Sequence, residues 1–365
     1  MPRGYKRGIN KENKKKKIFI FIALIILIIC ISGGILAYKV ITENNRKNEI
    51  SNNEENPKEP IVVELENEEE EKINIYQGND RPIAFMIDNH KSAQPQAGLN
   101  DAYIVYEIIV EGGESRLMAL FKGKNLDKIG PIRSSRHYFL DYAMENDAIY
   151  VHYGWSPQAQ SDISTYKINN INGISESNKT FWRVKDKSAP HNAVTSTEEI
   201  LKVAEKKNYR TTSDAESVLN YVSADVNLDN GDIANKITIP YSASNEVYYT
   251  YDSNTRMYTR YSKGKKQQDW VTGEDIKTKN IIITFAKNYT LNDGENKDRQ
   301  GLENIGSLEG YYITNGKAIK ITCNKSSRTA KTIYRDLNGN EIEVNDGNTF
   351  IQICPIDANV DNIEE

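Results

Sequence analysis

The stretch GPIRSSRHYFLDYAMENDAIYVHYGW, residues 130–155, predicts a helix followed by a strand. Gly130 and Pro131 interrupt the preceding element, and Ser134 or Ser135 can cap a helix whose apolar positions recur at helical spacing. The helix is expected over residues 135–146 and the strand over 148–153. A helix that leads into a buried strand is typical of an α/β fold, and this one brings two arginines and two histidines close together in the chain.

Arg133 and Arg136 fall at the predicted start of that helix. Free backbone N–H groups and the helix dipole favour an anion there, so the two guanidinium groups form a candidate carboxylate or phosphate clamp. The alternative is that both arginines pair with acidic neighbours such as Asp141, Glu145 or Asp147. The sequence leaves both interpretations open.

The N-terminal segment predicts a membrane anchor. Residues 1–17 form a basic tail, and residues 18–38 are apolar apart from Ser32 and two glycines. About 21 residues at 1.5 Å each match a ~30 Å hydrocarbon core, and basic flanks stay in the cytoplasm. The apolar run is longer than that of a signal peptide, and bulky Ile29 precedes Cys30 where a lipoprotein signal needs a small residue. We expect an uncleaved single-pass helix at the cell membrane, with the N-terminus cytoplasmic and the bulk of the chain extracellular.

The rest of the chain divides by composition. Residues 39–79 predict a disordered acidic stalk, because they contain too few apolar side chains to offset the entropy of ordering. Residues 80–210 predict a mixed α/β domain, and residues 223–355 a mostly antiparallel β domain rich in tyrosine and asparagine. Asn315-Gly316 and Asn338-Gly339 each separate two strand-like runs, which indicates hairpins. Residues 356–365 form an acidic tail.

Charge and cysteine content limit the possible partners. Residues 80–365 carry 34 Lys and Arg against 39 Asp and Glu, without a basic stripe, so we expect no nucleic-acid partner. Cys323 and Cys354 lie on two predicted strands outside the membrane. An oxidising exterior permits a disulfide between them, but the sequence does not show whether they are close enough, and buried free thiols are the alternative.

Candidate site residues gather in the α/β range. All four histidines lie there, and His90, His152 and His191 are at strand ends or in loops, where functional side chains commonly occur. The expected ligand-binding set is Asp88, Asn89, His90, Glu107, Glu111, Arg116, Arg133, Arg136, His152, His191 and Asn192. No HExxH or GxSxG motif is present, so we predict no metal or other cofactor and leave catalytic residues unassigned.

Several long strings carry a resemblance to a known family. RPIAFMIDNH, KIGPIRSSRHYFLDYA, YVHYGWSPQA and SAPHNAVTST in the α/β range, and WVTGEDIKTKNIIITF and KSSRTAKTIYRDLNGNEIEV in the β-rich range, resemble the YerB-like family of bacterial lipoproteins. The resemblance implies an extracytoplasmic, membrane-attached protein with N-terminal and C-terminal domains of unknown function, and no activity to carry over. Two features depart from the family: the predicted helical anchor in place of a lipidated cysteine, and Trp155 where glycine is usual.

Three functions are compatible with this pattern. We expect an envelope protein whose α/β domain binds an anionic or glycan-type ligand, such as a cell-wall glycan or peptide, through its arginines and histidines. A hydrolase of the same material, using a histidine with Asp88 or Glu111, is the enzymatic alternative. The third is a protein-interaction module of a membrane complex. The first two require that His90, Arg133, Arg136, His152 and His191 line one cleft.

Overall fold

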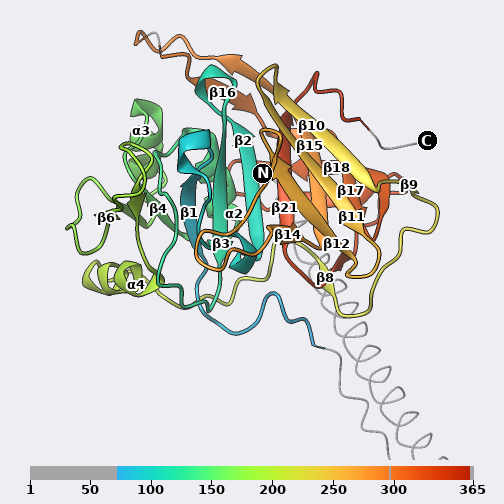
Figure 1. Ribbon diagram of the computed structural model, residues 1–365, viewed down its shortest axis with the longest axis horizontal. Helices are drawn as coiled ribbons and strands as arrows, with labels where there is room; N and C mark the ends of the chain where they lie inside the picture. Colours follow the sequence, from blue (N-terminus) through green and yellow to red (C-terminus); the bar gives the residue numbers. More distant parts are fainter. Residues whose placement is uncertain (1–71, 296, 362–365) are drawn as a thin grey trace, which may run out of the picture. The chain divides into compact units, whose positions relative to one another are not determined.

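The computed structural model describes residues 72–295 and 297–361. It is a mixed, sheet-rich fold with few helices, built from an N-terminal α/β part and a C-terminal β-rich part (Figure 1). Within the described residues, no helix has the length and apolar character needed to cross a membrane. The predicted basic tail, the predicted transmembrane helix and most of the predicted stalk, residues 1–71, lie outside the described residues.

The α/β part contains both strands and helices, among them the helix and the strand predicted within residues 130–155. Its apolar runs form strands whose two faces are both buried. The strands are β1 (Ile83–Asp88), β2 (Ile104–Ile109), β3 (Ser115–Phe121), β4 (Ile149–His152), β5 (Asn170–Asn172), β6 (Trp182–Arg183) and β7 (Ala193–Val194). The helices are α2 (His137–Glu145), α3 (Pro157–Thr165) and α4 (Thr197–Lys206), with 3-10 turns at Lys91–Ala93, Leu99–Asp101 and Glu111–Gly113.

The start of α2 differs from the sequence prediction. Its N-cap residue is Arg136, and no side chain caps it, so neither Ser134 nor Ser135 has that role. Ser135 instead forms an extended bridge with Trp155, and its hydroxyl accepts a hydrogen bond from Tyr150 (2.9 Å). The extended pairing with the chain after β4 therefore delays the helix until residue 137.

The β-rich part is mostly antiparallel. Its strands are β8 (Tyr221–Val222), β9 (Asp232–Ile233), β10 (Lys236–Ser242), β11 (Asn245–Asp252), β12 (Met257–Ser262), β13 (Lys265–Lys266), β14 (Lys277–Thr278), β15 (Asn280–Thr290), β16 (Gln300–Glu303), β17 (Gly306–Thr314), β18 (Lys317–Lys325), β19 (Ile333–Asp336), β20 (Val344–Asn345) and β21 (Thr349–Pro355). Asn315-Gly316 forms the turn between β17 and β18, with both residues at positive φ, as the type of turn requires.

One large sheet runs through both parts. Its order is β19-β18-β17-β15-β21-β2-β3-β1-β4-β5. β21, near the end of the chain, lies between β15 and β2 and is parallel to both, with Ile104 opposite Thr349 and Ile108 opposite Ile353. The boundary between the predicted ranges 80–210 and 223–355 thus divides the sequence but not this sheet.

The sheet is covered on both faces. Alternate residues such as Phe85 and Val105 belong to a core shared with α4 and the small sheet of β10 to β14, whereas Met86 and Tyr106 face α2. In Figure 1, β10 and β11 lie over the orange strands β15, β17 and β18. The small sheet therefore covers the C-terminal half of one face.

A buried ion pair joins the two parts at this covered face. On β2, Glu107 has the same orientation as the core residues Val105 and Ile109, and it is fully buried. Arg260 of β12, also fully buried, donates from Nη2 to Glu107 Oε2 (2.5 Å) and from Nε to the hydroxyl of Tyr249 (3.2 Å). Burial alone would lower the pKa of Arg260, but the charge and hydrogen bond of Glu107 raise it overall. This pair holds the small sheet against the large one.

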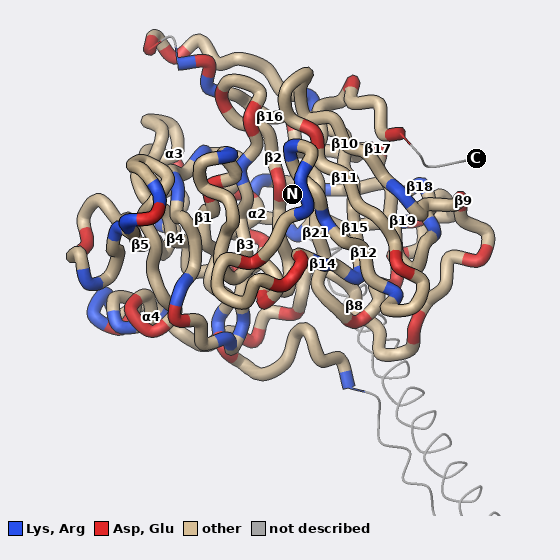
Figure 2. Tube along the Cα trace, in the orientation of Figure 1, with Lys and Arg blue, Asp and Glu red and all other residues tan. Residues whose placement is uncertain are grey.

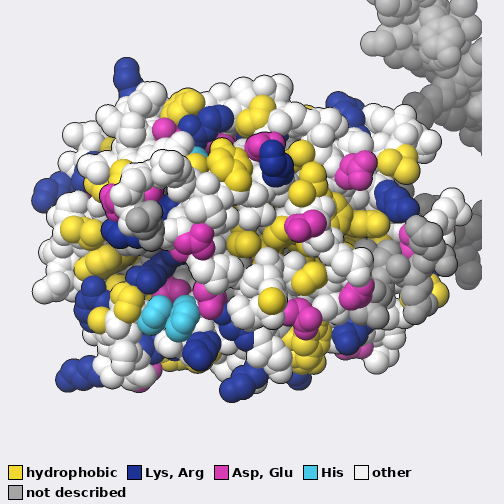
Figure 3. All heavy atoms as spheres, turned by 90° about the horizontal axis from the view of Figure 1, so that it is seen from above, with side chains coloured by type: hydrophobic (Ala, Val, Ile, Leu, Met, Phe, Trp, Pro, Cys, Tyr) yellow, Lys and Arg dark blue, Asp and Glu magenta, His cyan; other side chains and the backbone are white. Residues whose placement is uncertain are grey.

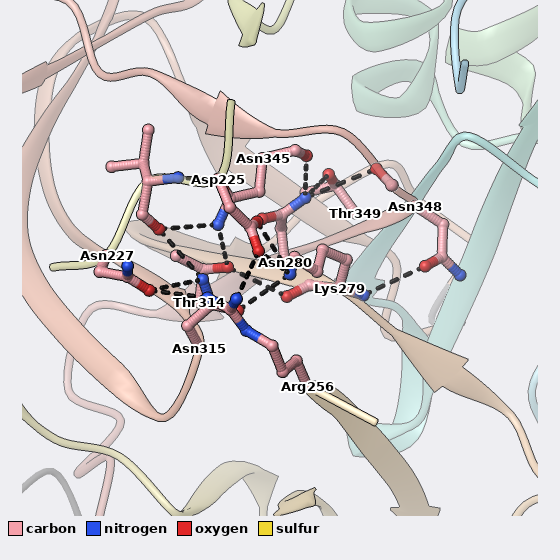
Figure 4. Close-up of polar contacts among 12 residues, drawn as sticks. Asp225, Asn227, Arg256, Lys279, Asn280, Thr314, Asn315, Asn345, Asn348 and Thr349 are labelled. Atoms are coloured by element: carbon pink, nitrogen blue, oxygen red, sulfur yellow. Dashed lines mark hydrogen bonds and ion pairs between the residues drawn. The ribbon is translucent and has the colours of Figure 1, made fainter. Parts of the chain in front are cut away.

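Asparagine side chains form hydrogen bonds between the segments that meet near the start of β21 (Figure 4). The amide nitrogen of Asn345 donates to the carbonyl oxygen of Val226 (2.9 Å) and to Thr314 Oγ1 (3.0 Å), and its amide oxygen accepts from the Val226 N–H (2.6 Å). Asn280 donates in turn to the carbonyl oxygen of Asn345 (2.8 Å). The side-chain amide of Asn345 thus satisfies the backbone N–H and carbonyl groups of Val226, which lies in the segment that links the two parts.

The two described cysteines, Cys323 and Cys354, are buried free thiols, so no disulfide joins them. Cys323 lies on β18 and Cys354 on β21, with β17 and β15 between them in the sheet. Three strand spacings separate them by roughly 14 Å, beyond the reach of a disulfide. Burial raises the pKa of Cys323 to about 12, so this thiol stays protonated at neutral pH.

Arg328 ties helix α2 to the β-rich part. Its Nε donates to Asp141 Oδ1 (2.7 Å), its Nη1 to Asp162 Oδ2 (2.8 Å) and its Nη2 to the carbonyl oxygen of His137 (3.1 Å). Burial and then the charge of Arg328 lower the pKa of His137 to about 4, and Arg136 adds to this effect while Asp162 opposes it. His137 is therefore neutral in the folded protein at neutral pH.

Removing the charge of Glu107 should destabilise the fold strongly. In Glu107→Gln, Arg260 keeps its charge without a counter-charge, and we expect a loss of about 3–5 kcal/mol in the free energy of unfolding. The double variant Glu107→Gln, Arg260→Met should lose less than Glu107→Gln alone, as measured by urea unfolding in a double-mutant cycle. Glu303→Gln, which breaks an exposed pair with Lys287, is the control and should change nothing measurable. Equal losses in the single and double variants would contradict this account.

The low pKa of His137 should make stability depend on pH. Below about pH 6.5 His137 is protonated in the unfolded chain, whereas in the folded protein it stays neutral down to about pH 4. The free energy of unfolding therefore falls as the pH falls from about 6.5 to about 4. His137→Gln cannot titrate. Compared with this variant, the wild type should lose about 2–3 kcal/mol between pH 7 and pH 4. A difference between the two unfolding free energies that stays constant with pH would rule the effect out.

Candidate binding site

Asp88 is the centre of a polar cluster at the carboxyl end of β1. The side chain is almost fully buried, and its Oδ2 accepts from His191 Nδ1 (2.8 Å) and pairs with Arg133 Nε (3.3 Å). Its Oδ1 accepts from the backbone N–H of His90 (3.0 Å). One carboxylate thus fixes three of the side chains or loops that the sequence singled out. Ligands of α/β sheets commonly bind at this end of a strand.

Backbone pairing brings these residues together from three segments. Residues 131–133 run beside β1, with the N–H of Asp88 donating to the carbonyl oxygen of Pro131 (2.8 Å) and that of Arg133 to Met86 (2.8 Å). The loop that carries His191 is attached to the same segment, because the N–H of Ile132 donates to Ala193 (2.6 Å).

The imidazole rings of His90 and His191 stack on each other. Their centroids are 4.3 Å apart and the ring planes differ by 15°. Figure 3 shows two adjacent histidine side chains at the surface, among basic and acidic ones. Burial is the largest cause that lowers the pKa of His90, so this ring is neutral at neutral pH.

The hydrogen bonds of the two Nδ1 atoms give the Nε2 atoms of His90 and His191 opposite hydrogen-bonding roles. His90 Nδ1 accepts from the N–H of Ser92 (3.1 Å), so in the neutral ring the proton is on Nε2. His191 Nδ1 faces the carboxylate of Asp88, so in the neutral ring the proton is on Nδ1 and Nε2 is an acceptor. Within residues 72–295 and 297–361 neither Nε2 has a hydrogen-bond partner. The stack thus offers one donor and one acceptor.

Glu111 organises a second group beside the first. Arg136 forms a bidentate pair with it, and Arg116, which lies opposite Asp88 in the strand register, approaches it to 4.0 Å. Burial, partly offset by Glu111, lowers the pKa of Arg116 to about 10, whereas Glu111, despite burial, has its pKa lowered by Arg136. Both Arg133 and Arg136 are therefore paired, but with Asp88 and Glu111 and not with the acidic neighbours named from the sequence.

The other predicted site residues have structural positions. Glu107 and Asn89 are buried beneath the cluster, where Asn89 Nδ2 donates to Glu107 Oε1 (3.0 Å). His152 is fully buried and bonded to the Gly154 carbonyl oxygen (2.8 Å) and Asn170 Oδ1 (3.1 Å), and burial lowers its pKa. Asn192 holds its own loop through the carbonyl oxygens of Val184 and Lys187 (3.1 Å each). Of the five residues expected to line one cleft, His90, His191 and Arg133 therefore meet at Asp88, Arg136 pairs with Glu111, and His152 is buried apart from them.

Sequence reasoning missed the contribution of the β-rich part. Lys263 pairs with Glu114, and both groups affect the pKa of His90. Trp270 lies against the loop after β1, with its N–H donating to the carbonyl oxygen of Gln96 (2.8 Å). No local pattern marks these residues, because the pairing of β21 with β2 alone brings them close to β1.

One cavity lies apart from the predicted site residues. A cavity of about 970 Å³ lies between α4 and the start of β1, lined by residues such as Arg81, Leu201 and Tyr209 and by none of the predicted site residues. Among the described residues, no group of three or more His, Cys, Asp or Glu side chains could hold a metal ion. Figure 2 shows acidic and basic residues interspersed over the described chain.

Comparison with known proteins agrees with the resemblance seen in the sequence. The model described as "Protein of unknown function (DUF3048) N-terminal domain" matches residues 69–210, and that of the corresponding C-terminal domain matches residues 237–351. A Bacillus subtilis (strain 168) protein described as "Putative lipoprotein YerB" is 31% identical over 286 residues, which cover 75% of this chain and 81% of that protein. The crystal structure of the YerB protein from Bacillus subtilis has a TM-score of 0.70 at 29% identity, covering 78% of this chain and 94% of that chain. Because both domains are matched and most of the relative is covered, this chain belongs to the DUF3048 family, to which its YerB-like strings had pointed.

Proposed function

We propose that this protein is attached to the membrane, faces the outside of the bacterial cell, and binds a glycan-type envelope ligand at the stacked histidines. The location is supported by the basic and apolar N-terminal segments and by the description of the Bacillus subtilis relative as a lipoprotein. The ligand is supported by one observation above all, the pair of outer nitrogens on His90 and His191.

A donor beside an acceptor is complementary to hydroxyl groups. A sugar hydroxyl accepts from His90 Nε2–H and donates to His191 Nε2, or two neighbouring hydroxyls each use one nitrogen. Both rings are held in place before binding, by Ser92 and Asp88, so little side-chain entropy is lost when the ligand arrives. The terminal nitrogens of Arg133, which has a quarter of its side chain exposed, add further donors at the edge.

A second candidate, hydrolysis, is favoured by the contact between Asp88 and His191. A carboxylate on Nδ1 fixes the tautomer in which Nε2 is a base, the arrangement that general-base catalysis requires. A ligand hydroxyl or a water molecule on Nε2 would be the proton donor. Binding without turnover and hydrolysis therefore use the same atoms, and only product formation separates them.

Binding should depend on the outer surface of this cluster. With full-length protein and the muropeptide N-acetylglucosaminyl-N-acetylmuramoyl dipeptide, calorimetry should detect binding that His191→Ala weakens at least about 10-fold, because the acceptor is lost. Arg256→Ala, which removes a half-exposed arginine paired with Asp225 in the β-rich part, is the control and should leave affinity unchanged. If the wild type gives neither heat nor a thermal shift with this muropeptide or with neutral N-acetylglucosamine oligomers, the proposal fails.

Asp88→Asn separates the two candidates. The asparagine amide can donate to His191 Nδ1, which moves the ring proton to Nε2 and removes the acceptor. If the protein is a hydrolase, chromatography should show product with the wild type and a rate at least about 100-fold lower with Asp88→Asn. If it only binds, no product should form with either protein, and Asp88→Asn should lower affinity alone.

A further inference from the structure

Two lysines lie over one indole, and one of them shares a loop with His191. Lys187 Nζ is 4.2 Å and Lys128 Nζ 4.5 Å from the ring centroid of Trp270. The three residues come from separate segments, two in the α/β part and one in the loop between β13 and β14. All three side chains are partly exposed. We call these three residues the Trp270 cluster.

The loop that follows β1 connects this cluster to the histidine pair. His90 begins the loop, and four residues later the carbonyl oxygen of Gln94 accepts from Lys187 Nζ (2.9 Å). The backbone N–H of Trp270 donates to the carbonyl oxygen of Gln96, and Asp269 Oδ2 accepts from the backbone N–H of Gly98 (2.6 Å). His191 and Lys187 share a second loop, which Asn192 fixes by donating to the carbonyl oxygen of Lys187. The cluster and the histidines therefore lie along the same two loops.

Charge compensation distinguishes these lysines from the cations described above. Arg133 is paired with Asp88, Arg116 and Arg136 with Glu111, and Lys263 with Glu114. Within the described residues, neither Lys128 nor Lys187 has a carboxylate oxygen within 4.0 Å. An aromatic ring holds a cation in position through its quadrupole without neutralising it, so both ammonium charges stay available.

Lys128 repels the charge of Lys187. Burial is the largest cause that lowers the pKa of Lys187, Asp186 opposes it, and repulsion by Lys128 adds a smaller lowering effect. An oxyanion placed between solvent and the two ammonium groups would relieve that repulsion and gain charge-assisted hydrogen bonds. Nothing comparable is available at the paired arginines, where an incoming anion must compete with Asp88 or Glu111.

We propose that Lys128, Lys187 and Trp270 form an oxyanion subsite that holds a carboxylate or phosphate group of the glycan bound at His90 and His191. The inference rests on the proposed function, and it makes the site a joint product of both parts of the chain. The histidines select hydroxyl groups, and the lysines select acidic glycans over neutral ones.

The test compares two ligands that differ only in charge. The probes are the N-acetylglucosaminyl-N-acetylmuramoyl dipeptide with free carboxylates and the same compound with those groups converted to carboxamides. Full-length wild-type protein should bind the acid about 10-fold more tightly than the amide, and the preference should shrink as salt rises. In Lys128→Gln, Lys187→Gln the preference should disappear while affinity for the amide is kept. Trp270→Leu, which frees both lysines from the ring, should reduce the preference.

The controls and the expected results distinguish the oxyanion subsite from glycan binding at the histidines. Lys287→Gln, Lys297→Gln removes two exposed lysines elsewhere and should retain the full preference, and equal thermal unfolding temperatures show that the variants are folded. If the Lys128, Lys187 double variant still prefers the acid as strongly as the wild type, the oxyanion subsite is refuted while glycan binding stands. Failure of the wild type to bind either form refutes both.

Discussion

The parallel pairing of β21 with β2 is the contact on which the rest of the structure depends. Parallel neighbours cannot be joined by a tight turn, and these two strands are separated by most of the described chain. The entropy of closing so long a loop must be offset by burial, and Phe350, Ile351 and Ile353 on β21 are buried on both faces of the sheet. The loops of the β-rich part can therefore take their places against β1 only when the large sheet is complete.

The same pairing explains why a carboxylate can be buried at the centre of the molecule. Because β2 lies beside β21, Glu107 faces the small sheet and meets Arg260. The hydroxyl of Tyr241 lies 3.0 Å from each of two acceptors that share its proton, the carbonyl oxygen of Glu107 and Gln352 Oε1. A charge pair removed from water contributes little net stability, but it penalises any packing that separates its members. Glu107 and Arg260 thus specify one relative position of the two sheets, and this position places Lys263 and Trp270 near the stacked histidines.

Local structure could be predicted from the sequence, but partners could not. Helix α2, strand β4 and the hairpin at Asn315-Gly316 could be predicted because apolar periodicity and turn residues act over a few residues. Arg133 was recognised because it lies at a predicted helix start, and His90 and His191 because functional side chains commonly lie at strand ends or in loops. His152 was misplaced for the same reason: it ends β4, yet its ring turns into the protein and bonds to Gly154 and Asn170. Contacts between distant segments determine the partners of the arginines, the burial of Glu107 and the position of Trp270 near the loop after β1. A single sequence does not encode such contacts locally.

The electrostatics of the candidate site follow from how each cation is held. Carboxylates orient the arginines and also cancel their charge, whereas Trp270 orients two lysines and leaves their charge intact. Residues 80–365 carry more acidic than basic groups, so the surface as a whole repels large polyanions. Screening limits that repulsion to about 8 Å at physiological salt. The charge that a small anion meets at the loops after β1 is therefore set by the side chains within this distance, and the acidic groups farther away contribute less.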